Sequence, residues 1–170
     1  MVQVRAKETP ARDLIEIVRQ LVSSLPVPVI VNDRADIAII AGAAGVHLGA
    51  DDLPVDAVRA FAVPSFIIGA SLGSSAELES AREADYVGIG PAFVTASKSD
   101  AGRPLSFEEI AALERMAGAP AVAIGGISAA NAGELLARCP RLAGVAALSS
   151  LFGADDVESA ARALRAASGR

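Results

Sequence analysis

The stretch VPVIVNDRADIAIIAGAAGVHLGADD, residues 27–52, decides the fold of this chain. It opens with a β-branched run at 27–31, interrupted by Pro28 near its start. An alanine- and isoleucine-rich segment at 35–41 then predicts a helix, and Gly42 is typical of a helix stop. A second apolar run at 45–48 predicts another strand. Two strands that flank a helix through short connections predict a parallel βαβ unit.

The same alternation continues on both sides of this stretch. A helix is predicted after Pro10, because Leu14, Ile17, Val18 and Leu21 share one helical face. The other predicted strands are 2–4, 66–70, 86–89, 122–124 and 144–148. The other predicted helices are 54–61, 76–83, 107–116, 128–139 and 155–167. We therefore expect seven βα units in one domain that spans residues 1–170.

Two α/β architectures fit seven parallel βα units, a doubly wound sheet and a TIM-type (β/α)₈ barrel. A doubly wound sheet usually concentrates its site at one switch point, whereas a barrel draws on all of its βα loops. Polar or turn-forming residues lie at the C-terminal ends of the predicted strands: Arg5, Asn32, Asp33, His47, Ser71, Gly90, Pro91, Gly125, Gly126 and Ser149. This distribution favours the barrel, with about seven of its eight units present.

Composition limits the classes of partner. The formal net charge is −5, so nothing favours binding to nucleic acid or to an anionic membrane. Cys139 is the only cysteine, which excludes an internal disulfide and makes a cytoplasmic location the default expectation. No apolar run reaches the length of a membrane span, and the N-terminal residues lack a signal-peptide pattern.

A glycine pair and a serine pair form the first candidate site. Gly125 and Gly126 follow a predicted strand and precede a helix predicted to begin at Ser128. Glycine lets backbone N–H groups approach an anion closely, and a helix N-terminus favours negative charge. Phosphate often binds in barrels at the loops after strands seven and eight, where Ser149 would add a hydroxyl. A tight turn without a ligand is the competing interpretation.

Two pairs of residues that contain aspartate form the second candidate site. Asn32 and Asp33 end one predicted strand, and Asp51 and Asp52 follow the next. Carboxylates at the ends of neighbouring parallel strands can converge on Mg²⁺, which needs few protein ligands and leaves positions for diphosphate oxygens. Helix capping is the alternative role for each aspartate.

Basic and hydroxyl groups complete the candidates. Gln3 and Arg5 lie two apart on a predicted strand and therefore share a face, and Arg5 suits bidentate contact with phosphate. The loop at 91–98 supplies hydroxyls and an amine, and is long enough for a functional lid. A solvated strand edge and a solvated surface loop are the respective alternatives.

Together these segments resemble the thiamine phosphate synthase family and the related thiazole tautomerases. The matching stretches are VQVRAK (2–7), VPVIVNDRADIAI (27–39), GVHLGADDLP (45–54), IIGAS (67–71), ADYVGIGPAFVTASK (84–98), AVAIGGIS (121–128) and GVAALSSLF (144–152). Tautomerases of this group often carry histidine where this chain has Pro91, which favours the synthase. The resemblance implies a (β/α)₈ barrel. Family chains begin with a further strand and helix before the Gln-x-Arg-x-Lys strand, so we expect the first unit to be missing here.

The resemblance also implies a reaction and its residues. A hydroxymethylpyrimidine diphosphate loses diphosphate to give a pyrimidine carbocation, which the nitrogen of a thiazole phosphate attacks. The implied diphosphate ligands are Arg5, Asn32 and Lys98. Asp33 and Asp52 are implied to bind Mg²⁺. Gln3, Ser71, Thr95 and Ser97 would contact the pyrimidine or the leaving group, and Gly126 and Ser149 the thiazole phosphate. Arg5, Ser71 and Lys98 are the implied catalytic residues.

Two alternatives stay open on the sequence. One is a phosphate-binding or regulatory paralogue without activity, and the other is a thiazole tautomerase. We expect small phosphorylated pyrimidine and thiazole partners, and exposed strand edges lead us to expect self-association.

Overall fold

The computed structural model describes residues 1–95 and 102–169, which form two compact units. Unit 1 comprises Met1–Ser71 and Glu79–Asp85, and unit 2 comprises Leu72–Leu78 and Tyr86–Arg170. Each unit is built from parallel strands that alternate with helices. No helix among the described residues is both long enough and apolar enough to cross a membrane.

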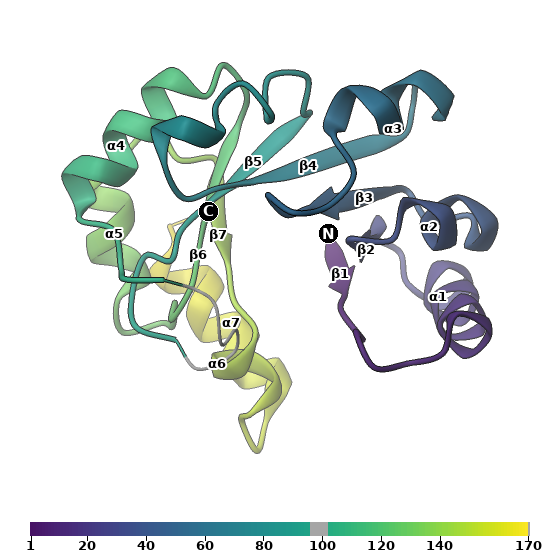
Figure 1. Ribbon diagram of the computed structural model, residues 1–170. Helices are drawn as coiled ribbons and strands as arrows, with labels where there is room; N and C mark the ends of the chain where they lie inside the picture. Colours follow the sequence, from purple (N-terminus) through teal and green to yellow (C-terminus); the bar gives the residue numbers. More distant parts are fainter. Residues whose placement is uncertain (96–101, 170) are drawn as a thin grey trace. The chain divides into compact units, whose positions relative to one another are not determined.

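Unit 1 contains the βαβ stretch that decides the fold. Its elements are β1 (Val2–Val4), α1 (Ala11–Ser24), β2 (Val29–Asn32), α2 (Ala35–Ala41), β3 (Gly45–Leu48), α3 (Val55–Phe61) and β4 (Ile67–Leu72, whose last residue belongs to unit 2). The four strands pair in chain order and in parallel. The helices α1 and α2 pack on each other and contact β2 (Figure 1).

The core of unit 1 explains this arrangement. Val31, Val46 and Ile68 are register neighbours on β2, β3 and β4, and each is fully buried. The helix α1 contributes Leu14 and Val18 to the same apolar core. Burial of such aliphatic side chains stabilises the fold by about 1.5–3 kcal/mol each.

Unit 2 continues the βα alternation. Its elements are η1 (Ser75–Glu77), β5 (Tyr86–Ile89), α4 (Phe107–Met116), β6 (Ala121–Ile124), α5 (Ala132–Arg138), β7 (Gly144–Ala146), α6 (Ser149–Phe152) and α7 (Val157–Ala167). The strands β5, β6 and β7 pair in parallel and in chain order. The helix α7 packs against α5 and α6 (Figure 1).

Several predicted elements are confirmed to the residue: 35–41, 45–48, 86–89 and 107–116. Gly42 adopts a left-handed conformation with φ of 75° and ends α2, as predicted.

Three predictions were wrong. The helix predicted at 76–83 is only a 3₁₀ turn at Ser75–Glu77. The Glu77 carboxylate accepts a hydrogen bond from the Gly73 N–H at 2.7 Å, and this local bond favours a turn over a helix. The helix predicted from Ser128 begins at Ala132. The strand predicted to reach residue 148 ends at Ala146, and the unpredicted helix α6 begins at Ser149.

The late start of α5 has a local cause. The Asn131 side chain accepts a hydrogen bond from the Ser128 N–H at 2.9 Å and donates to the Gly126 carbonyl at 3.0 Å. These two bonds close a turn over residues 126–131, and the helix begins only after that turn.

Candidate functional site

Polar side chains gather at the C-terminal ends of the strands of unit 1. Asn32 at the end of β2 is the register neighbour of His47 on β3, and His47 is the neighbour of Gly69 on β4. Ser71 lies two residues beyond Gly69. Because the strands are parallel, their ends lie at one edge of the sheet of unit 1, as predicted from the sequence.

Asp33 has an unusual backbone directly after β2. Its φ is 65°, and it is the only described residue other than glycine with a positive φ. Its N–H donates to the His47 carbonyl at 2.8 Å, and the next N–H, of Arg34, donates back to the Asn32 carbonyl at 2.8 Å. A left-handed conformation costs roughly 1–2 kcal/mol in an L-residue, and aspartate tolerates it better than most. These two hydrogen bonds restrain the backbone at Asp33, and with it the direction in which the Asp33 side chain leaves the backbone.

Asp52 reaches the same place from the loop after β3. Its carboxylate accepts a hydrogen bond from the Gly49 N–H at 2.6 Å. Burial raises the pKa of the Asp52 carboxyl; the Gly49 N–H opposes this, and the hydrogen bond and negative charge of Asp33 raise the pKa further. The two carboxyl groups are thus direct neighbours, although they are 19 positions apart in the sequence.

A positive charge accompanies this pair. The Lys7 ammonium lies 3.2 Å from Oδ2 of Asp33, and its charge also lowers the pKa of Asp52. The Lys7 side chain is 49% exposed and that of Asp33 is 23% exposed. The ion pair between Lys7 and Asp33 was not predicted from the sequence.

The Asp33 and Asp52 side chains fit a magnesium ion. Both offer oxygen, the donor that Mg²⁺ prefers, and two carboxylates are as many as Mg²⁺ usually takes from a protein. Among residues 1–95 and 102–169, no group of three or more histidine, cysteine or acidic side chains is placed to hold a metal. Two carboxylates would leave the other coordination positions of Mg²⁺ to water or to further oxygen ligands.

Ser71 has a defined partner in unit 1. Its hydroxyl lies 3.2 Å from Nε2 of His47. Both side chains are half-buried. The imidazole can fix the orientation of the hydroxyl, which is a role for His47 that its flanking apolar residues did not indicate.

Gln3 and Arg5 lie at β1. Gln3 is within the strand and Arg5 directly follows it, and both side chains are exposed. Arg5 forms no hydrogen bond or ion pair with another described residue. Its guanidinium is therefore available to an anion.

The glycine pair in unit 2 permits a close approach of two loops. Gly125 and Gly126 have φ values of 99° and 61°. The Gly125 carbonyl accepts from the Phe93 N–H at 3.0 Å, and a Cβ on Gly126 would lie 2.4 Å from the Val94 carbonyl oxygen. The tight turn considered on the sequence is present, and it gives these glycines a structural role whether or not a phosphate binds.

Ser149 and Ser150 differ in environment. Ser149 opens α6 and is exposed, whereas the Ser150 hydroxyl donates to the Ile127 carbonyl at 2.6 Å. The loop after β6 is therefore joined to α6 through Ser150. Sequence reasoning missed this bond, and the serine pair was the only signal for it.

The remaining predicted residues follow β5 in the sequence. Thr95 is half-buried at the end of the described part of the loop after β5. Ser97 and Lys98 lie outside the described residues.

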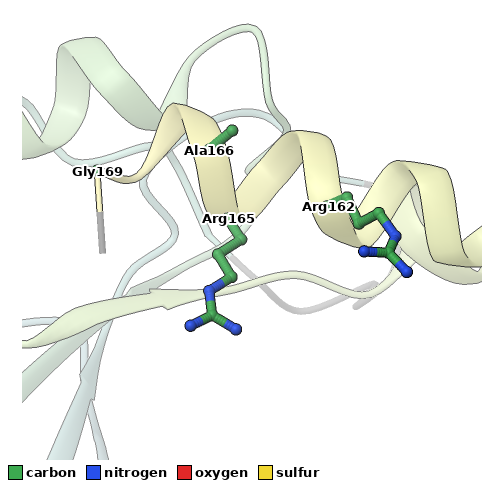
Figure 2. A pocket seen from close by; sticks show the side chains of 4 residues that line it. All are labelled: Arg162, Arg165, Ala166 and Gly169. Carbon is green, nitrogen blue, oxygen red and sulfur yellow. The ribbon is translucent and has the colours of Figure 1, made fainter.

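Unit 2 has a hollow of about 440 Å³ at the C-terminal part of α7. Arg162, Arg165, Ala166 and Gly169 line it, and Figure 2 shows both guanidinium groups on the same side of the helix. Arg162 is already ion-paired with Glu158. None of the predicted site residues lines this hollow.

Known structures define the class of fold. The thiamine phosphate pyrophosphorylase of Pyrococcus furiosus is similar with a TM-score of 0.84 and 37% identity, over 98% of this chain and 81% of that one. A 3-hexulose-6-phosphate synthase shares the fold with a TM-score of 0.68 at 21% identity, over 97% of this chain and 85% of that one. The chain is thus an α/β protein of the TIM (β/α)₈ type, with seven βα units.

Sequence comparison then gives the family. A sequence model described as thiamine monophosphate synthase matches residues 1–151, and the chain belongs to that family. The thiamine-phosphate synthase of Methanoculleus marisnigri is 45% identical over 170 residues, which cover 97% of this chain and 80% of that protein. That of Moorella thermoacetica is 41% identical over 96% of this chain and 80% of its own length.

Proposed function

We propose that this protein is a thiamine-phosphate synthase. It would join hydroxymethylpyrimidine diphosphate to thiazole phosphate and release diphosphate. Family membership supports this proposal, and relatives named thiamine-phosphate synthase match nearly the whole chain. The observation that carries it is the adjacent pair of Asp33 and Asp52 at the strand ends of unit 1, since a diphosphate leaving group needs a cation beside it.

The residues of unit 1 would act on the diphosphate. Arg5 would bind its oxygens through a planar pair of N–H donors, and Asn32 would donate through its amide. Asp33 and Asp52 would hold Mg²⁺, which when bound neutralises charge on the departing diphosphate. Ser71, oriented by His47, would donate to the pyrimidine or the leaving group, and Gln3 would contact the pyrimidine.

The residues of unit 2 would bind the second substrate, and those of the loop after β5 would contact the first. The Gly126 N–H and the Ser149 hydroxyl would donate to the thiazole phosphate, since both are donors at neighbouring strand ends. Thr95 and Ser97 would contact the pyrimidine side, and Lys98 the diphosphate. Catalysis would consist mainly of positioning the two substrates and stabilising the leaving group.

Three wider predictions accompany this function. The 170 residues would work as one barrel domain. The protein would act in the cytoplasm, and it would self-associate through exposed strand edges. Mass measurement by light scattering would test the last of these.

The activity test compares two neighbouring aspartates. With both substrates and Mg²⁺, Asp52→Ala is expected to lower kcat for thiamine phosphate formation about 100-fold or more, because one metal ligand is lost. Asp33→Ala should behave alike. Asp51→Ala is the matched control, since Asp51 is exposed and has no assigned role, and it should keep the wild-type rate.

Two results would contradict the proposal. One is a well-folded wild-type protein that forms no thiamine phosphate, which would favour a binding-only protein. The other is an equal loss in Asp51→Ala and Asp52→Ala, which would remove the specific role of Asp52.

A further inference from the structure

The carboxylate pair of unit 1 already has a cation. The Lys7 ammonium lies 3.2 Å from Oδ2 of Asp33. Asp33 directly follows β2 and Asp52 lies in the loop after β3, the neighbouring parallel strand, so both carboxyl groups lie at one edge of the sheet of unit 1. Two carboxyl groups in contact repel each other when both are ionised, and a nearby positive charge offsets that repulsion.

Backbone conformation and backbone hydrogen bonds restrain the two aspartates, whereas the Lys7 side chain has no such restraint. Asp33 is held by its left-handed backbone and by its N–H bond to His47, and Asp52 by the Gly49 N–H at 2.6 Å. Lys7 lies three residues beyond the end of β1 and is half exposed. Its four-carbon side chain can change rotamer at little cost, since an exposed ion pair contributes little to stability.

The Lys7 ammonium and a magnesium ion would compete for the carboxylate oxygen atoms of Asp33. A magnesium ion requires carboxylate oxygens at about 2.1 Å in a near-octahedral shell. An ammonium in hydrogen-bond contact with Oδ2 of Asp33 occupies one side of that carboxylate and repels a second cation. A metal ion that takes Oδ2 of Asp33 would therefore move the ammonium away from this oxygen.

We propose that Lys7 is a resident counter-cation of the Asp33–Asp52 pair, which a divalent cation displaces from Asp33 when it binds. This inference rests on the proposed magnesium site. Lys7 stabilises the pair when the metal is absent, and it weakens metal binding before substrate arrives. Anionic substrate oxygens that arrive with the metal would offset this weakening.

The test is calorimetric titration of the folded protein with Mg²⁺ alone, without substrate. Lys7→Met is expected to lower the Kd for Mg²⁺ about two- to fivefold, because no ammonium competes for Asp33. Lys7→Arg keeps the charge and should bind Mg²⁺ as the wild type does. Lys7→Gln serves as a second neutral variant if Lys7→Met does not fold.

Arg5→Met is the matched control. It removes one positive charge from the same end of β1, but Arg5 has no ion pair with a described residue. A gain in Arg5→Met as large as that in Lys7→Met would overturn the inference, because the effect would then be general charge repulsion. An unchanged Kd in both neutral Lys7 variants would overturn it too.

The Asp33→Ala variant separates this inference from the proposed function. Loss of Mg²⁺ binding in Asp33→Ala with an unchanged Kd in Lys7→Met leaves the metal site standing and rejects only the role of Lys7. Equal binding by the wild type and Asp33→Ala would reject the metal site, and the inference with it.

Discussion

Gly126 has a φ of 61°, and a Cβ at this position would lie 2.4 Å from the Val94 carbonyl oxygen and 2.9 Å from the Phe93 Cβ. Gly118, after α4, has a similar φ of 68°, but a Cβ there would meet no atom within 4 Å. The two positions share a backbone conformation and differ only in the space around it.

This pair makes a residue-scale prediction about stability. Gly118→Ala should lower the free energy of unfolding by about 1–2 kcal/mol, the cost of a left-handed L-residue. Gly126→Ala should cost roughly 1–3 kcal/mol more, because the loop that carries Val94 must also move. Urea unfolding measures the free energy of unfolding of both variants. Equal decreases would show that the loop that carries Val94 can move without an energetic cost.

Glu114 is the one buried charged side chain among the described residues, at 8% exposure, and its Oε1 lacks a hydrogen-bond partner. Burial raises the pKa of its carboxyl, and the charges of Arg141 and Arg115 only partly oppose this. The folded protein therefore releases this proton at a higher pH than the unfolded chain does. This group lowers stability as the pH rises above the ordinary carboxyl range.

Glu114→Gln should remove that penalty. The variant is expected to be more stable than the wild type at pH 7, where the unfolded chain ionises Glu114, and to show no gain at about pH 3.5, where both states are protonated. Urea unfolding at the two pH values measures the difference. A gain of the same size at both would assign the effect to packing instead of charge.

At the residue scale, the sequence predicted the placement of the carboxylates. Asp33 and Asp52 follow neighbouring parallel strands and lie at one edge of the sheet of unit 1, while their role as metal ligands stays a prediction. The Lys7 ion pair and the His47–Ser71 contact depend on side-chain rotamers and loop paths. Those are set by packing, which has no periodic signal in the sequence.

At the scale of elements, α4 begins with a complete capping box. The Ser106 side chain accepts from the Glu109 N–H at 3.2 Å, and the Glu109 carboxylate accepts from the Ser106 N–H at 2.7 Å. Arg103 binds that carboxylate through two N–H groups and, with the Ser106 N–H, lowers its pKa to about 2. These bonds satisfy donors that a helix start otherwise leaves unpaired.

Ser106→Ala should therefore lower the free energy of unfolding by about 1 kcal/mol. Ser106→Thr is the matched control and should retain most of the stability, since threonine supplies the same oxygen. Thermal and urea unfolding of the three proteins test this. A threonine variant as weak as the alanine variant would mean that the cap bond is not the cause.

Elements were predicted well where periodicity and end signals agreed, as in α2 between Asp33 and Gly42. They were predicted poorly where a polar side chain bonds to the local backbone. Glu77 bonds to the Gly73 N–H and Asn131 to the Ser128 N–H, and each replaces helix by turn. Such competition between side chain and backbone depends on one bond, so neither composition nor hydrophobic pattern reveals it.

At the scale of the whole molecule, the formal charge of −5 does not by itself favour the two proposed anionic substrates. Local positive charge exists in unit 1, where the Lys7 ammonium lies 3.2 Å from the Asp33 carboxylate and Arg5 is exposed directly after β1. The residues proposed for the diphosphate and metal belong mainly to unit 1, and those proposed for the thiazole phosphate belong to unit 2.

The sequence alone determined the βα alternation, the parallel strands and the strand ends at which the polar residues lie, because hydrophobic period and glycine positions are local and repeat along the chain. Only the tertiary structure decided which side chains touch. It paired Asp33 with Asp52, set Lys7 on Asp33, and left Gly126 no room for a side chain. Each of these contacts joins residues distant in sequence, and only the packing of loops on the strands brings them together.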